Sequence, residues 1–362
     1  NKIIKNAKID NEIVVIVING EILEILGDKD YIEEKGVAVL NLSDAYHYFE
    51  KELKDYYLND VKKLLKEDKF FALNVALNQG GIFVYVPPNI KIQKPIRVIK
   101  ILTGNGVKTS KDMIFVDRFA SLTYLEELIS LESDLKSETR YFNSTELLIG
   151  KGSDVKYFYI HTPNDETETI LIKRFTTYRD SNLESTVAWL GGKRIISKIK
   201  VDLKGENGKV NHLEIVLGDR NERFDLYTTL YHIVGRTIGN ITHMGVLKGN
   251  SKQIFSGLIK IGKNAQRTNS SLSSHTILLT REASSFGVPG LEIEANNVKA
   301  SHSASVSPID SDQVFYMRNR GMNEDLAKKL IALGFLEPAI AKIPLKNVRN
   351  RIIKIFDKKW DY

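Results

Sequence analysis

Three histidines in this sequence have surroundings that could support chemistry. His302 stands between Ser301 and Ser303 at the end of a β-prone run, so a single imidazole lies among small polar side chains. His232 and His243 are eleven residues apart, on what the pattern predicts to be adjacent strands that could stack on successive coils. A facing pair of imidazoles is a candidate metal site. For this pair, a structural role at the surface or in a side-chain ladder is the favoured interpretation.

Other residue types that carry chemistry are missing or wrongly spaced. There is no cysteine, which excludes disulfides, thiolate nucleophiles, zinc fingers and any all-thiolate cluster site built by this chain alone. The segment Gly104–Ser110 lacks the spacing of a phosphate-binding loop and is interpreted as a turn. No G-x-S-x-G, H-E-x-x-H or paired-carboxylate pattern stands out. The sequence therefore predicts no self-sufficient active site, and we expect a protein that is not an enzyme.

Composition indicates a globular chain without a polyanionic partner. Its 362 residues exceed one ordinary core and suggest two domains or one elongated domain. Lys and Arg outnumber Asp and Glu by 52 to 45, but they occur in short pairs among acidic residues rather than in a dense stripe. No apolar run approaches the roughly 20 residues that a membrane helix needs. We expect a cytoplasmic protein that binds neither nucleic acid nor a membrane.

The elements that must position these residues are mostly strands. Short β-prone runs separated by turn-forming residues occupy 82–86, 96–102, 145–150, 155–160, 195–203, 210–218, 224–234, 241–247, 253–261, 275–280, 291–295 and 298–303. Such a regular series, with no clear intervening helix, argues against a βαβ fold and leaves a sandwich, barrel, propeller or β-helix. No sharp sequence period selects among these four.

Two flanking regions have different patterns. The chain opens with a hairpin-like pattern around Asn19-Gly20, followed by helical periodicity over Asp44–Lys66 and Lys69–Leu77. We therefore predict an N-terminal mixed α/β region (1–81) before the β core (82–305).

The C-terminal segment (306–362) is predicted to be helical. An amphipathic pattern begins at Ser311, with a turn at Arg320-Gly321 and a helix end at Gly334.

The segment from Ser273 to Ile340 resembles the SufB/SufD family, whose members build the scaffold for iron–sulfur cluster assembly. The family pattern there joins leucine-rich and P-x-L-E-I strands to an S-H-G-A-T motif, an F-Y pair, an R-G pair and a final G-F pair. The matching residues are Leu278, Leu279, Ala283, Pro289, Leu291, Glu292, Ile293, Val298, Ser301, His302, Ala304, Asp310, Phe315, Tyr316, Arg320, Gly321, Ala327, Leu330, Gly334 and Phe335. So many fixed spacings make chance agreement implausible. Asn74–Val86 and Pro95-Ile96 also resemble the family.

This resemblance implies a mainly β fold with a right-handed parallel β-helix core, flanked by the N-terminal α/β region and the C-terminal helices. It also places His302 on the histidine of the S-H-G-A-T motif, where SufD-type members carry a proposed cluster or iron ligand. The alternative is a hydrogen-bonded histidine that closes the last coil. The chain departs from the motif at Ser303, where the family has glycine, and at Ser305, where it has threonine.

The resemblance implies a SufD-like, non-catalytic subunit that pairs with a SufB-type homologue or with itself. SufB-type members are thought to supply a cluster-ligating or sulfur-carrying cysteine, so the absence of cysteine favours the SufD side. We expect the isolated chain to bind no cluster stably, and an iron–sulfur cluster to form only transiently in the complex. Two alternatives remain: a β-helix carbohydrate-active enzyme and a purely structural β-helix scaffold.

The resemblance also implies a SufC-type ABC ATPase as a partner, docked on the C-terminal helices. Their apolar residues form more surface than two short helices can hide. Part of that surface is expected to cover the end of the β-helix. The candidate docking residues are Phe315, Tyr316, Leu326, Leu330, Leu333 and Phe335.

Overall fold

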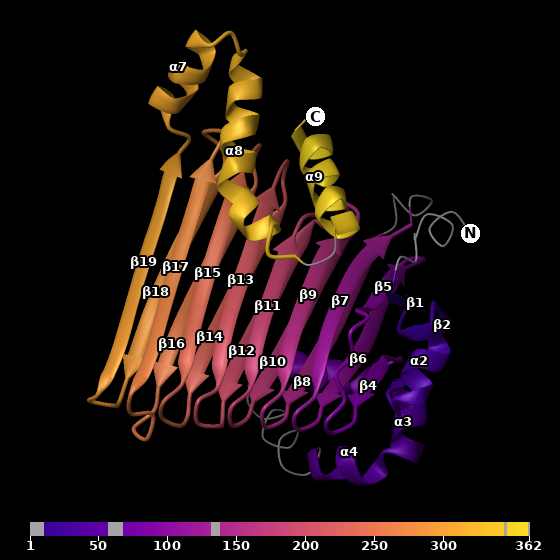
Figure 1. Ribbon diagram of the computed structural model, residues 1–362. Coiled ribbons are helices and arrows are strands. Elements are labelled where there is room, and N and C mark those ends of the chain that lie inside the picture. The colour runs from indigo at the N-terminus through magenta and orange to yellow at the C-terminus, as the bar shows by residue number, and fades with distance from the viewer. Residues whose placement is uncertain (1–10, 57–67, 132–137, 344–345, 361–362) are drawn as a thin grey trace.

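The structure is a computed structural model that describes residues 11–56, 68–131, 138–343 and 346–360. Its centre is a parallel β-solenoid whose successive strands alternate between two facing sheets (Figure 1). Sheet A contains β1 (Ile13–Ile18), β2 (Glu21–Leu26), β5 (Ile96–Leu102), β7 (Ser121–Ser130), β9 (Asp154–Thr162), β11 (Asn182–Trp189), β13 (Lys209–Gly218), β15 (Ile238–Leu247), β17 (Thr268–Leu278) and β19 (Val298–Pro308). Sheet B contains β3 (Ala38–Asn41), β4 (Ile82–Val86), β6 (Gly106–Val116), β8 (Thr139–Ile149), β10 (Thr167–Thr177), β12 (Arg194–Leu203), β14 (Arg223–His232), β16 (Lys252–Ile261) and β18 (Ser284–Ile293). The predicted mainly β fold with a parallel β-helix core is confirmed.

Coils of unequal length explain why the sequence shows no period. Paired positions on neighbouring coils are 26 residues apart at Glu168 and Arg194, but 33 apart at Ser121 and Asp154. Each strand still stacks in register on the next, because insertions fall in the turns between strands. A repeat of variable length is therefore regular in space but not along the sequence.

The turns depend on residues that accept a left-handed backbone. Gly81 has φ +145°, and a Cβ at this position would lie 1.7 Å from the carbonyl oxygen of Lys111. At the corners that lead from sheet B to sheet A, one residue with positive φ recurs in most coils: Asn89, Phe119, Gly152, Asp180, Asn207, Arg236 and Arg267. The sequence predicts a turn over the whole segment Gly104–Ser110, and this prediction is wrong from Gly106 onward. There, β6 begins and pairs with β8.

The N-terminal region joins the solenoid rather than standing apart from it. β1 pairs antiparallel with β2 and parallel with β5, while β3 pairs antiparallel with β4. The predicted hairpin is confirmed, with φ of 49° at Asn19 and 100° at Gly20. The helices here are α2 (Lys29–Glu34), α3 (Leu42–Tyr48), α4 (Glu50–Tyr56) and α6 (Lys69–Ala76). The helical pattern predicted over Asp44–Lys66 is present to residue 56, and its remainder lies outside the described residues.

The predicted helical C-terminal segment is present, and it contains three helices in the described residues rather than two: α7 (Ser311–Asn319), α8 (Glu324–Ile340) and α9 (Lys346–Trp360). The predicted turn at Arg320-Gly321 is confirmed, with a φ of 89° at the glycine. The predicted helix end at Gly334 is wrong, because α8 continues to Ile340 and includes Pro338. Apolar residues beyond the glycine, such as Leu336 and Ile340, are buried against sheet A, and this packing outweighs the low helix propensity of glycine.

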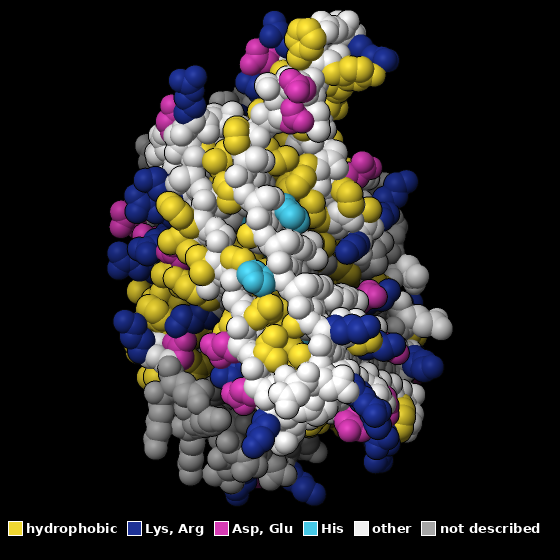
Figure 2. All heavy atoms as spheres, turned by 90° about the vertical axis from the view of Figure 1, so that its left-hand side faces the viewer, with side chains coloured by type: hydrophobic (Ala, Val, Ile, Leu, Met, Phe, Trp, Pro, Cys, Tyr) yellow, Lys and Arg dark blue, Asp and Glu magenta, His cyan; other side chains and the backbone are white. Residues whose placement is uncertain are grey.

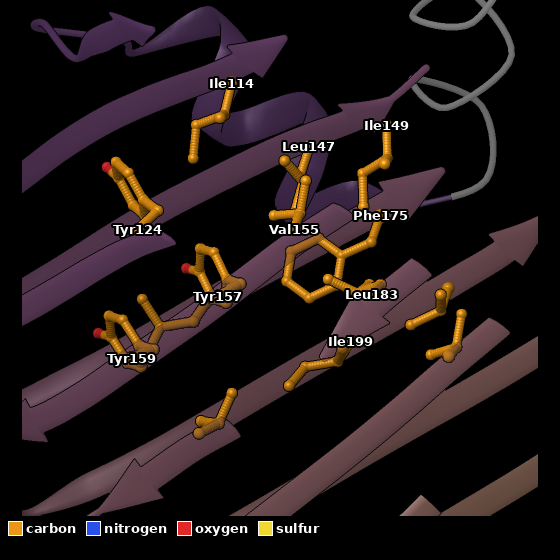
Figure 3. Packing of buried hydrophobic residues seen from close by; sticks show 14 of the residues in the cluster. Ile114, Tyr124, Leu147, Ile149, Val155, Tyr157, Tyr159, Phe175, Leu183 and Ile199 are labelled. Atoms are coloured by element: carbon orange, nitrogen blue, oxygen red, sulfur yellow. The ribbon is translucent and has the colours of Figure 1, made fainter. Parts of the chain in front are cut away.

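The main core lies between the two sheets. Side chains alternate inward and outward along each strand, and equivalent inward positions stack from coil to coil. Figure 3 shows aromatic and aliphatic side chains filling this space, and the rings of Tyr124 and Tyr157 stack with centroids 5.7 Å apart. Outside, α8 and α9 cover part of sheet A, while α3, α4 and α6 cover the first strands of sheet B. None of the described helices combines the length and apolar character needed to cross a membrane.

Candidate functional site

The candidate site lies at the end of the solenoid formed by β18 and β19. Within the described residues, no further strand pairs with the outer edge of either one, so this end is open. Most of β19 is exposed, in contrast to the buried inner strands. In Figure 2, hydrophobic and uncharged side chains occupy the centre of this end, with two histidines among them and charged side chains mainly at the periphery.

His302 occupies an inward-facing position in the last coil. It pairs in register with the buried Leu272 of β17, yet its own side chain is exposed because no coil covers it. Ala304 lies two residues further along β19 and faces Gly287 of β18 across the solenoid interior. A Cβ added to Gly287 would lie 3.7 Å from the Cβ of Ala304. The strand therefore presents an imidazole among small side chains at the open interior.

The structure separates the other two candidate histidines. His232 ends β14 in sheet B, whereas His243 lies in β15 of sheet A, so they do not stack on successive coils of one sheet. His232 hydrogen-bonds with Thr237 (Nδ1 to Oγ1, 2.7 Å) and Ser270 (Nε2 to Oγ, 3.0 Å).

His243 has surroundings of its own. Its ring stacks on Phe255 at 4.1 Å between centroids, and its Nδ1 lies 3.1 Å from the Oγ of Ser274. Burial lowers the pKa of both His232 and His243 to about 4. Among the described residues, no group of three or more His, Asp or Glu side chains is arranged to hold a metal ion.

The six apolar residues expected to dock a partner fall into two groups. Phe315, Tyr316, Leu326 and Leu330 are exposed. Leu333 and Phe335 are half-buried and pack on the apolar layer that joins α8 to sheet A. In Figure 1, α7 and the first turns of α8 project beyond the ends of the strands. The first group therefore forms a free apolar surface, while the second helps to attach α8.

A buried ionic network inside the solenoid was not predicted. Lys100 donates hydrogen bonds to Asp112 and Glu126, and the Glu126 contact is 2.8 Å. Glu126 also accepts a hydrogen bond from Tyr157 (3.0 Å), whose hydroxyl in turn accepts one from Lys173 (2.8 Å). Burial opposes charge on both lysines. The two carboxylates nevertheless raise the pKa of Lys100 well above its usual value, whereas burial lowers the pKa of Lys173 to about 8.

A second buried network lies closer to the open end. Ser185 Oγ is 2.5 Å from His212 Nδ1, and His212 Nε2 is 3.2 Å from Glu214. Glu214 also accepts hydrogen bonds from the indole of Trp189 (3.0 Å) and from Thr228. Burial raises the pKa of Glu214, but the hydrogen bonds outweigh burial, and the pKa is lowered. Ser185, His212 and Glu214 are all buried, so this serine–histidine–glutamate group forms part of the hydrogen-bonded interior.

Comparison with known proteins adds the decisive observation. Residues 101–335, which include the second network, the open end and most of α8, match the family described as SUF system FeS cluster assembly, SufBD core domain. The chain belongs to the SufBD family. Residues 8–98 match the SufBD protein N-terminal region, so the two matches together extend from the first strands into the C-terminal helices.

Curated SufBD proteins are similar over nearly the whole chain. Iron–sulfur cluster assembly SufBD family proteins of Staphylococcus haemolyticus, Staphylococcus saprophyticus and Staphylococcus aureus are each 28% identical over 329 residues. The alignment covers 89% of this chain and 69% of each relative. The resemblance deduced from the segment Ser273–Ile340 is thereby confirmed at the level of the SufBD family.

Proposed function

We propose that this chain is a SufD-like, non-catalytic subunit of an iron–sulfur cluster assembly scaffold in the cytoplasm. The observation that carries the proposal is the open end of a SufBD solenoid, where His302 occupies an inward-facing position that no further coil covers. The absence of cysteine supports the SufD assignment, because a subunit without thiols depends on another protein for sulfur ligands.

Pairing through the open end would complete this site. The outer edges of β18 and β19 carry backbone groups that lack a neighbouring strand among the described residues. Exposed edges of this kind add strands from another chain readily. A SufB-type homologue or a second copy of this chain would cover the edges and bring new side chains next to His302.

The cluster is the cargo of such a complex rather than a resident cofactor. His302 would supply one neutral imidazole, while cysteine thiolates would come from the SufB-type partner. The isolated chain has only imidazole, carboxylate and hydroxyl ligands to offer, and these hold iron–sulfur clusters poorly. A cluster would therefore persist only while the partner is bound.

A SufC-type ABC ATPase is the second proposed partner. Its docking surface would be formed by Phe315, Tyr316, Leu326 and Leu330, whose exposed side chains range from 39% to 65% accessible. Large apolar side chains on a projecting helix are typical anchors for a groove on a partner. No nucleic acid or membrane partner is proposed.

The carbohydrate-active alternative has less support. Enzymes of that kind need carboxylates in an open groove. Here Asp112, Glu126 and Glu214 are buried inside the solenoid and engaged by lysine, histidine, tryptophan or hydroxyl donors.

Affinity purification of the tagged chain from its native cells tests the proposal. We expect an ABC-type ATPase and a cysteine-containing SufBD homologue to co-purify, or the ATPase together with a dimer of this chain. Anaerobic reconstitution should give persistent visible absorption for the recovered complex and none for the lone chain. Recovery of the chain as a monomer without either partner would overturn the proposed function.

A further inference from the structure

The last helix, α9, is attached to the solenoid by a chain of ionic contacts as well as by apolar packing. Arg351 of α9 donates a hydrogen bond to Glu127 on β7, which accepts another from Arg97 on β5 at 2.6 Å. Arg97 in turn contacts Glu12, which immediately precedes β1, at 3.1 Å. We call these four residues the ion chain; Glu12, Arg97 and Glu127 are buried.

A second polar attachment holds the other end of α9. Lys359 donates to both carboxylate oxygens of Glu222 at 2.7 Å and to the carbonyl oxygen of Leu217 at 3.0 Å. Lys248 donates to the carbonyl oxygens of Lys359 and Trp360, at 2.9 and 3.0 Å. We call this group the C-terminal anchor. It lies eight residues beyond Arg351, or about 12 Å along the helix.

Between these two attachments α9 is packed and joined to α8. Val348, Ile352 and Phe356 are each no more than 2% exposed and lie in the apolar layer on sheet A. Lys329 of α8 forms an ion pair with Asp357 of α9 at 2.8 Å. The two helices are therefore connected to each other and to strands far apart in the solenoid.

We infer that Glu127 and Glu222 are positioning residues that hold α8 and α9 as one rigid unit on sheet A. The two helices would thereby transmit a displacement of the projecting end of α8 to β7, β5 and β1. These strands lie at the end of the solenoid remote from His302 (Figure 1). The inference about transmission rests on the proposed ATPase docking, whereas the attachment of α9 stands on its own contacts.

Ionic contacts hold α9 on the solenoid in addition to its apolar packing. Without Arg351, Glu127 would keep Arg97 but lose its contact from α9. Without Lys359, Glu222 would keep the backbone N–H of Asp219 but lose its contact from α9. Both changes leave the apolar contacts of α9 intact. The helix should then detach more often while the solenoid beneath it stays folded.

Hydrogen exchange of the full chain tests the attachment. The variants are Arg351→Gln, Lys359→Gln and their combination, and the matched control is Lys354→Gln at an exposed position of the same helix. In the double variant, amides of residues 346–360 should exchange about tenfold faster, while those of β11 to β17 keep their rates. High salt should produce part of this effect in the original chain. Unchanged exchange of α9 in the double variant overturns the inference.

A second measurement tests transmission. With the SufC-type ATPase of the same genome bound, exchange in β5 and β7 should differ between ATP-bound and ADP-bound states. In the double variant the ATPase should bind with unchanged affinity, but the nucleotide-dependent difference should stop at α8. A difference that still reaches β7 overturns the positioning role. If the ATPase does not bind the original chain, both the proposed docking and the transmission are refuted. The attachment of α9 is then judged only from the hydrogen exchange of its amides.

Discussion

His302 and Leu272 occupy the same register position on neighbouring strands, one exposed and the other buried. The difference arises only because β19 is the last strand of sheet A. A further chain placed against β19 would bury His302 as β19 buries Leu272. A partner bound at this end, as proposed, would therefore turn the surface that carries the imidazole into an interior.

Replacing His302 with alanine should separate assembly from folding. Because the side chain is exposed, we expect His302→Ala to change the free energy of unfolding by less than about 0.5 kcal/mol. The yield of cluster on the reconstituted complex should fall severalfold. His275→Ala is the matched control, since His275 lies near the same end but faces the outer side, where it hydrogen-bonds with Ser305. An equal yield from both variants would return His302 to a structural role.

A bulky charge at the open end should prevent pairing. Ala304 is exposed and faces the interior side of the last coil, so Ala304→Arg should keep the thermal midpoint of the chain. It should abolish association with a SufB-type chain or with a second copy, as measured by analytical ultracentrifugation. Ser301→Arg lies on the outer side of the same strand and should have the smaller effect. Undiminished association of Ala304→Arg would place the pairing surface elsewhere.

Charges on the projecting part of α8 should weaken ATPase binding. Leu326→Asp and Leu330→Asp introduce carboxylates at side chains that are 43% and 39% exposed. Each should raise the dissociation constant for the SufC-type ATPase at least about fivefold, because losing one apolar anchor costs more than about 1 kcal/mol. Leu23→Asp is the control, since Leu23 is 59% exposed and lies on β2, away from the helix. Equal binding by all three variants would contradict the docking surface.

The two buried lysines should differ in their importance for stability. Lys100→Met leaves Asp112 and Glu126 without their shared cation, and we expect a loss of about 3–5 kcal/mol. Lys173→Met should cost less, because Glu126 keeps Lys100 and Tyr157 as donors. Urea unfolding at pH 7 measures both changes. A larger loss for Lys173→Met would show that the network is organised around the other lysine.

Buried histidines should make the protein sensitive to mild acid. Burial is the main cause that lowers the pKa of His161 to about 3 and the pKa of His232 and His243 to about 4. Below about pH 6.5 these histidines bind protons in the unfolded chain but not yet in the folded chain. The free energy of unfolding is therefore fully retained above that pH and decreases as the pH falls toward 4. Each histidine contributes up to about 1.4 kcal/mol per pH unit in this range.

Unfolding of His161→Gln at several pH values tests this assignment. Its free energy of unfolding should depend less steeply on pH between 6.5 and 4.5 than that of the original chain. His47→Gln, at an exposed position, should leave the slope unchanged. Identical slopes for all three proteins would mean that other groups cause the acid sensitivity.

Many of the strands could be predicted because they carry a local signal, whereas β6, β7, β10 and β11 were not predicted as strands. The run 96–102 coincides with β5, and the helical pattern from Ser311 begins at the first residue of α7. The family motif around His302 also had a local sequence signature. By contrast, the separation of His232 from His243 depends on which sheet each strand joins, and strand periodicity carries no such information.

The interior networks were missed because their partners are distant in sequence. One signal was available: Lys100 shares a face with Ile96, Val98 and Leu102, so alternation alone placed a charge on the buried side of β5. The identity of its partners could not be inferred, since Asp112 and Glu126 lie on β6 and β7. The continuation of α8 past Gly334 likewise depended on a sheet surface that the local pattern does not contain.

Charged residues are concentrated in one part of the solenoid interior, so the coils are not interchangeable. Around β5 to β10, charged groups from several strands must meet, so an added or deleted coil there would leave unmatched ions. In β16 and β18, beyond the second buried network, the interior side of sheet B is largely apolar, with scattered hydroxyl and amide groups. Evolution or design could lengthen the protein there by duplicating one turn, and the distance between its two ends could change while the ionic part stayed intact.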